Sequence, residues 1–310
     1  MVTVHLLRYG AIAHVDLGDI DNLPPELLDQ IIFENNDNDF QSIRSASLVS
    51  KTWRAVSLRY LFSVVGFYSE SDCLRWNTIA ESMPHVLAYV QHVTCAPGKH
   101  MMKALHAQYT GRGNSPEYHA AVAELFRQGR KTVTLDFPDI PTMPSVFSFA
   151  WDTPPYVEPG AVQFSPNMER FFRAFPAVTS VFFSSALPID SACTILSAFP
   201  STKMLTWMKG VTLPPPGEVY APFIGQLSNL QRLRLWGASN VPLFDWLDRA
   251  LADSPLRMIS LYHTTPISVE KLKRLLKGAS DTLVELEVTS DLVDCGTYYS
   301  FDFLIETYNR

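Results

Sequence analysis

Hydrophobic and polar positions divide the chain into three stretches, of which the first, about Asn22–Phe62, is a run of helical patterns without a glycine. Leu27 and Leu28 each lie four residues before an isoleucine, which is the spacing of an apolar helix face. A polar loop at Glu34–Asp39 separates this predicted helix from two further helical patterns. Three short helices of about forty residues form only a small core. We therefore expect this block to dock on the rest of the chain or on a partner.

The second stretch, about Ser63–Pro166, mixes helical and strand patterns. The predicted helices are Ser69–Ser82 and Glu117–Gln128, and the predicted strands are Tyr89–Cys95 and Lys131–Phe137. Between Pro138 and Pro166 the chain is rich in proline and aromatic residues and shows almost no helical period. This composition predicts a long packed loop.

The third stretch repeats a frame of three apolar or semi-apolar residues, spaced L-x-x-L-x-L. The five sets are Val178/Val181/Phe183, Thr202/Leu205/Trp207, Leu230/Leu233/Leu235, Leu256/Ile259/Leu261 and Leu283/Leu286/Val288. Their middle positions lie about 24 to 28 residues apart, within the period of leucine-rich repeats. The helical patterns between these frames are Asp190–Phe199, Leu243–Ala252 and Ser268–Lys277. Each unit is thus predicted to be one strand and one helix, stacked on its neighbours around a continuous core.

The repeats are clearest over residues 176–290. Val90/Val93/Cys95 and the Val133/Leu135 strand fit the frame more loosely and are interpreted as earlier, longer units. The alternative is an ordinary α/β domain whose amphipathic strands are unrelated to one another.

The N-terminal helical block resembles an F-box. The matching segments are Leu23-Pro24-Pro25-Glu26-Leu27-Leu28 with Ile31-Ile32, and Ser45-Ala46-Ser47-Leu48-Val49-Ser50-Lys51-Thr52-Trp53-Arg54. Arg59-Tyr60-Leu61-Phe62, which closes the block, is similar to F-box proteins of basidiomycete fungi, in which irregular leucine-rich repeats follow. The resemblance implies an α/β chain with an N-terminal extension (1–21), a three-helix F-box (22–62) and an irregular leucine-rich-repeat-like β/α solenoid for substrate recognition (63–310).

The resemblance also implies binding rather than catalysis. F-box helices dock on a Skp-family adaptor, which joins them to a cullin–RING ubiquitin ligase, and the C-terminal region recognises the protein to be ubiquitinated. The positions that match the adaptor contacts are Leu23, Pro24, Leu27, Leu28, Ile31, Leu48, Val49 and Trp53. Internal packing is an equal alternative for Leu28, Ile32 and Val49. The alternative function is a stand-alone leucine-rich-repeat scaffold with no ligase role.

In the repeat frame the apolar residues point inward, so the residues flanking the last two face the other side of each strand. Aromatic residues and arginine, which anchor many interfaces, occupy these positions in the middle of the array. The predicted substrate patch is Arg232, Arg234, Trp236 and Tyr262, with Arg232 favouring an acidic partner. In the alternative interpretation, Trp236 and Tyr262 shield strand edges or pack under the Pro138–Pro166 loop.

Composition and the absence of known catalytic motifs narrow the range of functions that the chain can have. Of the 310 residues, 47% are hydrophobic and 18% are charged, with a formal net charge of −6. These values exclude a disordered chain and argue against nucleic acid as the main partner. No HExxH, GxSxG, GxGxxG or Walker-type motif occurs, and the four cysteines form no CxxC pair. We therefore predict no enzymatic activity, metal or cofactor; a hydrolase hidden in Pro138–Pro166 is the remote alternative.

The hydrophobic segments predict no secretory leader and no membrane span. Val2–Leu7 is short and interrupted by His5, and the longest uncharged stretch, Ala174–Ile189, contains two prolines. The expected location is the cytoplasm or the nucleus, where separate cysteines stay reduced.

Overall fold

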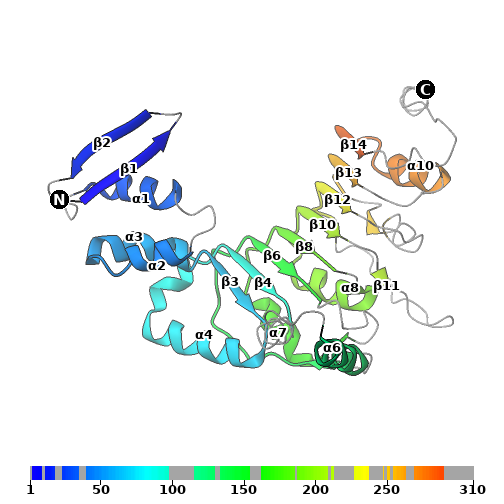
Figure 1. Cartoon of the computed structure of the whole chain (residues 1–310). Helices are drawn as coiled ribbons and strands as arrows, with labels where there is room; N and C mark the ends of the chain where they lie inside the picture. Colours follow the sequence, from blue (N-terminus) through cyan, green and yellow to red (C-terminus); the bar gives the residue numbers. More distant parts are fainter. Residues whose placement is uncertain are drawn as a thin grey trace.

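The chain forms a mixed α/β structure with a mostly parallel sheet, as a computed structural model shows (Figure 1). The structure describes residues 2–8, 11–17, 23–34, 40–97, 115–129, 133–153, 162–185, 187–208, 211–212, 227–236, 247, 250–251, 254–262 and 269–289. The N-terminal extension contains a hairpin that the sequence analysis did not predict. Its antiparallel strands are β1 (Val2–Arg8) and β2 (Ala11–Leu17).

Three helices follow the hairpin where the apolar patterns predict them. They are α1 (Pro25–Glu34), α2 (Phe40–Ala46) and α3 (Lys51–Leu61). Ser50 caps α3, since its hydroxyl accepts a hydrogen bond from the Trp53 backbone N–H at 3.4 Å. The helices enclose a small core that is separate from the main one. Its buried residues are Leu28, Ile32, Ile43, Trp53 and Val56.

Within the described residues, the main sheet consists of eight strands whose order in the sheet is their order along the chain. They are β3 (Val64–Phe67), β4 (His92–Cys95), β6 (Ser148–Trp151), β8 (Ser180–Phe183), β10 (Met204–Met208), β12 (Arg232–Trp236), β13 (Met258–Tyr262) and β14 (Glu285–Thr289). All neighbouring pairs are parallel. In Figure 1 they follow one another in a row, with α7, α8 and α10 beside it.

The sheet register aligns the middle residue of every predicted frame. Leu205 lies opposite both Val181 and Leu233, and Ile259 lies opposite both Leu233 and Leu286. The periodicity seen in the sequence is therefore the hydrogen-bonding register of the sheet. The side chains of β8, β10, β12 and β13 at these positions are buried. This is expected because alternate residues of a strand point to the same face of the sheet.

The prediction of a long loop between Pro138 and Pro166 is wrong. This stretch contains β6, which is a central strand of the main sheet, and β7 (Val162–Phe164). Val146, Phe149 and Trp151 follow the same L-x-x-L-x-L spacing as the later frames, and all three are buried. The first frame was also missed: Phe62, Val65 and Phe67 lead into β3.

The interpretation of Val133/Leu135 as a repeat unit is also wrong. The strand β5 (Val133–Leu135) pairs with β7 in a separate two-stranded sheet. The frame Val90/Val93/Cys95, in contrast, lies in the main sheet, where Val93 is opposite Phe149. A further pair of short strands, β9 (Leu187–Pro188) and β11 (Val211–Thr212), forms another two-stranded sheet.

Further helices lie between the strands along the chain, and most of them contribute buried residues to the core of the main sheet. They are α4 (Glu70–Ser82), the 3-10 helix η2 (Pro84–Ala88), α6 (Pro116–Gly129), α7 (Pro166–Arg173), α8 (Ile189–Ala198) and α10 (Val269–Gly278). The predicted helix Leu243–Ala252 is described only in part, and residues 247 and 250 are helical. The eight-residue helix α7 was not predicted. Phe171 and Phe172 of α7 contribute to a core rich in aromatic rings.

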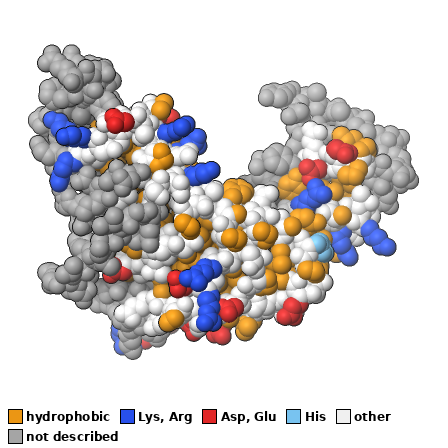
Figure 2. Space-filling view, turned by 180° about the vertical axis from the view of Figure 1, so that it is seen from behind, with side chains coloured by type: hydrophobic (Ala, Val, Ile, Leu, Met, Phe, Trp, Pro, Cys, Tyr) orange, Lys and Arg blue, Asp and Glu red, His pale blue; other side chains and the backbone are white. Residues whose placement is uncertain are grey.

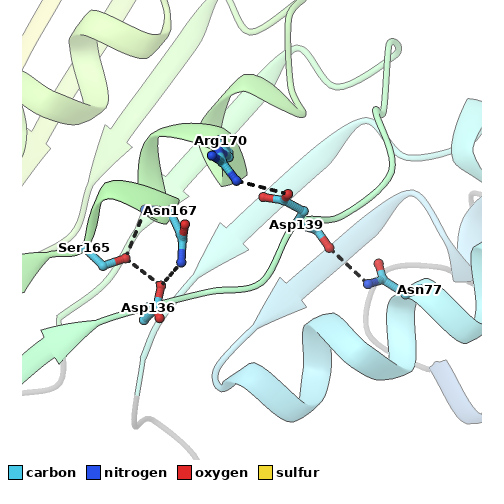
Figure 3. A network of polar contacts seen from close by, with 6 residues as sticks. All are labelled: Asn77, Asp136, Asp139, Ser165, Asn167 and Arg170. Carbon is cyan, nitrogen blue, oxygen red and sulfur yellow. Dashed lines mark hydrogen bonds and ion pairs between the residues drawn. The ribbon is translucent and has the colours of Figure 1, made fainter.

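A polar network fixes the chain segment after β5 to the start of α7 (Figure 3). The Asp136 carboxylate accepts hydrogen bonds from the Ser165 hydroxyl at 2.6 Å and the Asn167 side chain at 3.0 Å. Ser165 is the N-cap of α7, so the carboxylate lies at a helix start, where negative charge is favourable. Nearby, Asp139 forms an ion pair with Arg170 at 3.9 Å and accepts a hydrogen bond from Asn77 of α4 through its backbone carbonyl.

We expect this network to make part of the thermal stability depend on pH. Hydrogen bonds from Ser165 and then Asn167 hold the pKa of the Asp136 carboxyl below its ordinary value of 3.8. A carboxyl whose pKa is lower in the folded state stabilises the fold above its unfolded pKa, and this contribution is lost as pH falls. The melting temperature of Asp136→Asn should therefore be below that of the wild type at pH 6, and the difference should shrink by pH 3. A pH-independent difference would show that the charge of Asp136 is unimportant.

Candidate functional site

The helical block exposes large apolar side chains at positions that the sequence analysis assigned to a partner. Leu27 is 47% exposed, Leu48 is 73% exposed and Val49 is 56% exposed, while Pro24 is also exposed. We call these four residues the helical-block patch. Because the block has its own buried core, this apolar surface is not needed for its internal packing.

The other predicted adaptor-contact residues lie deeper. Leu28 is fully buried and Trp53 is 7% exposed, and both belong to the core of the block. Leu23 and Ile31 are half-buried against the same core. Of the residues for which internal packing was an equal alternative, Leu28 and Ile32 are thus internal and Val49 is not. Leu28 and Trp53 therefore stabilise the block from its interior.

The turn that carries Leu48 and Val49 is held by hydrogen bonds on both sides. Their backbone N–H groups donate to the carbonyl oxygens of Ser45 and Ala46 at 3.0 and 3.1 Å. The Arg54 guanidinium donates to the Ser47 carbonyl oxygen at 3.3 Å, which ties the turn to α3. The two apolar side chains are therefore presented by an ordered backbone.

A further hydrogen bond ties the first and third helices together. The Tyr60 hydroxyl of α3 donates to the Asp29 backbone carbonyl of α1 at 3.3 Å. Burial, followed by the effect of Asp29, raises the pKa of Tyr60 to about 12. Tyr60 therefore keeps its proton at physiological pH and remains a hydrogen-bond donor between α1 and α3.

The outward face of the main sheet carries the four predicted substrate-patch residues. On β12, Leu233 and Leu235 are buried, while Arg232 and Trp236 are exposed and Arg234 is half-buried. The register places Arg234 opposite Ser260, and Trp236 opposite Tyr262 of β13. All four residues are thus brought together on two adjacent strands.

Two contacts order the aromatic end of this patch. The rings of Trp236 and Tyr262 have centroids 5.1 Å apart and planes inclined by 34°. The Tyr262 hydroxyl donates a hydrogen bond to the Glu287 carboxylate of β14, and this bond raises the pKa of the phenol. Trp236 nevertheless remains 44% exposed.

The alternative that Trp236 and Tyr262 lie under the Pro138–Pro166 stretch finds no support in its described residues. Phe149 and Trp151 of that stretch are buried in the core, and the Phe164 ring packs against Trp151 and Phe172. Residues 154–161 of the stretch lie outside the described part of the chain.

A second apolar area, which was not predicted from the sequence, lies at the other end of the sheet. Val64 and Phe147 are exposed, and the His92 ring meets Phe147 edge-on with centroids 4.7 Å apart. Burial lowers the pKa of His92. The missed frames at β3 and β6 were the sequence signal that could have located these residues. In Figure 2, hydrophobic side chains gather over the middle of the molecule, whereas charged side chains lie mostly toward its ends and lower edge.

The described residues contain no group of three or more His, Cys, Asp or Glu side chains arranged to hold a metal ion. Cys73 and Cys95 are free thiols in the core, and burial raises the pKa of both. Cys193 is free and half-buried, while Cys295 lies outside the described residues. Among the helices described, none has the length and apolar character needed to cross a bilayer.

No protein-family model matches this chain, and no curated protein is significantly similar to it in sequence.

Proposed function

We propose that this chain is the substrate-recognition subunit of a Skp–cullin–F-box ubiquitin ligase. The observation that carries the proposal is the helical-block patch, in which Leu27, Leu48 and Val49 are each about half exposed or more. These three residues lie in the segments that match the F-box pattern. An apolar surface on an ordered block is typical of a site that docks on a partner.

The remainder of the proposal concerns the sheet. We interpret the parallel strands in chain order, with aligned frames, as an irregular leucine-rich-repeat-like solenoid. Its outward face would bind the target protein at Arg232, Arg234, Trp236 and Tyr262. In this proposal the chain brings a target to a cullin–RING ligase in the cytoplasm or nucleus and catalyses no reaction itself.

Co-purification with a Skp-family adaptor tests the docking. We expect Leu48→Asp to lower adaptor affinity by about 100-fold or more, because an unpaired carboxylate in an apolar contact costs several kcal/mol. Leu27→Asp should act in the same direction. Circular dichroism should show an unchanged fold for both variants, since Leu27 and Leu48 are exposed in the free chain.

Leu74→Asp is the matched control. Leu74 is 52% exposed, but it lies on α4, outside the helical block. Its variant should bind the adaptor as the wild type does, and so should a chain that lacks residues 1–21. Equal adaptor binding by Leu48→Asp and Leu74→Asp would contradict docking through the helical-block patch. A wild-type chain that binds no adaptor would favour the stand-alone scaffold.

A further inference from the structure

We propose that the outward face of β12 and β13 recognises an acidic segment of the target protein, with a carboxylate at Arg232 and Arg234 and an adjacent apolar side chain at Trp236 and Tyr262. The inference rests on the proposed function for its biological setting. The binding chemistry follows from the described side chains of β12 and β13.

The two arginines have no anionic partner within the described structure. No ion pair joins Arg232 or Arg234 to a carboxylate in that part of the chain; the pairs found there are Arg127–Glu124, Arg170–Asp139 and Arg173–Glu169. The Arg234 Nε atom is buried and meets no acceptor. Because the Arg234 side chain as a whole is only half-buried, its guanidinium is still open to a ligand that brings an acceptor.

A second, independent group points to the same place. Ser260 lies directly opposite Arg234 across β12 and β13, and its side chain is fully buried at an outward position. Its hydroxyl has no partner within hydrogen-bonding geometry, although it lies close enough to Tyr262 to affect the pKa of that phenol. Two buried polar groups without a partner in this part of the chain, Arg234 Nε and the Ser260 hydroxyl, thus lie side by side beneath the proposed site.

The aromatic pair supplies the apolar half of the site. Trp236 stacks on Tyr262, and the hydrogen bond from Tyr262 to Glu287 holds the phenol in place. An ordered and partly exposed aromatic pair is a surface that binds an apolar side chain with little loss of side-chain entropy. The half-buried Met208 lies opposite Trp236 on the other side, where a methionine adapts to different apolar shapes.

The charges on the neighbouring strand favour a carboxylate over a phosphate. Glu285 and Glu287 of β14 lie two strands beyond Arg232 and Arg234 in the sheet. The two carboxylates offset the positive charge of the two arginines at longer range. A compact monoanion can be held by Arg234 at short range, whereas a phosphate carrying about two negative charges is repelled more strongly by β14.

A displayed library of random peptides, selected on the purified full-length chain, supplies the probe. We expect the selected peptides to share an Asp or Glu beside Leu, Phe or Trp. Each would then be synthesised in three forms, with the carboxylate, with the matching amide, and with phosphoserine at that position. The carboxylate form should bind at least about tenfold more tightly than either of the others, and its affinity should fall as salt rises.

Variants of the chain locate the site. Arg234→Met and Trp236→Ala should each weaken the carboxylate peptide by at least about tenfold. Arg173→Met is the matched control, because it removes the same charge from an exposed position of α7 in the helical layer. It should leave peptide binding unchanged.

Several outcomes would overturn the inference. They are a library that yields no peptide, selected peptides that bind the amide form equally well, tighter binding of the phosphoserine form, and an Arg234→Met variant that binds as well as Arg173→Met. Failure of the proposed function is seen separately, because Leu48→Asp should lose the adaptor and keep the peptide, while Arg234→Met should do the reverse. Peptide binding by a chain that never binds the adaptor would leave the acidic-segment site in place and remove only the ligase role.

Discussion

Replacing Phe172 by alanine should lower the free energy of unfolding by about 3–5 kcal/mol. The Phe172 side chain on α7 is fully buried, so its removal leaves a cavity in the core. Its ring has centroid distances of 5.7 Å to Phe149, 5.6 Å to Phe164 and 6.1 Å to Phe199. The variant therefore loses contacts with a strand of the main sheet, a strand of the small sheet and the end of α8. Urea denaturation followed by circular dichroism measures the loss.

Phe147→Ala is the control for this prediction. Phe147 has the same side chain and lies just before β6, but it is 43% exposed. Its loss should cost about 1 kcal/mol or less, as is typical of exposed positions. If the two variants were equally stable, α7 would not pack on the sheet as described here.

Replacing Trp53 by alanine should unfold the helical block and leave the main sheet intact. Trp53 belongs to a buried cluster with Leu28, Ile32, Ile43 and Val56, and this cluster is separate from the core of the sheet. Removal of a buried tryptophan costs about 3–5 kcal/mol, which exceeds what a core of about forty residues supplies. Hydrogen exchange should show lost protection in α1 and α3 and unchanged protection in β8 and β10.

Trp236→Ala serves as the matched variant, because Trp236 is exposed on the sheet. It should leave the exchange of both regions close to that of the wild type. Equal loss of protection in the block and in the sheet of Trp53→Ala would mean that the two cores unfold as one cooperative unit.

The sequence predicts those parts of the fold whose signal is local. The Leu28/Ile32 spacing marks the face of α1 that is buried, and the middle residues Val181, Leu205 and Leu233 align in the sheet as their spacing implies. The strand β6 was missed for a different reason. Phe149 lies in the same frame, but α6 and the strand β5, which pairs elsewhere, separate β6 from β4. A search for frames at one fixed spacing misses a strand that is separated from the previous one by such a long insertion.

For the two candidate surfaces, the sequence predicts which residues are involved but not which side chains are exposed or how they contact one another. Helical spacing cannot distinguish Leu28, which is buried, from Leu27, which is exposed, because the packing of α1 on α3 decides which side of the apolar face is covered. The stacking of Trp236 on Tyr262 follows from the register of β12 and β13. The hydrogen bond from Tyr262 to Glu287 depends on side-chain conformations that a strand pattern does not contain.

The described strands of the main sheet follow one another across the sheet in their order along the chain, so no strand of this sheet is inserted between two earlier ones. Contacts of modest sequence separation carry a small loop-closure cost, and they favour rapid folding. We expect β3 and β4 to pair while later strands are still being synthesised. Each later strand can then pair with the edge of a sheet that has already formed. Among the described strands β14 is synthesised last and carries Glu287, so the bond that orders Tyr262 forms after the other described strands of the sheet have been made.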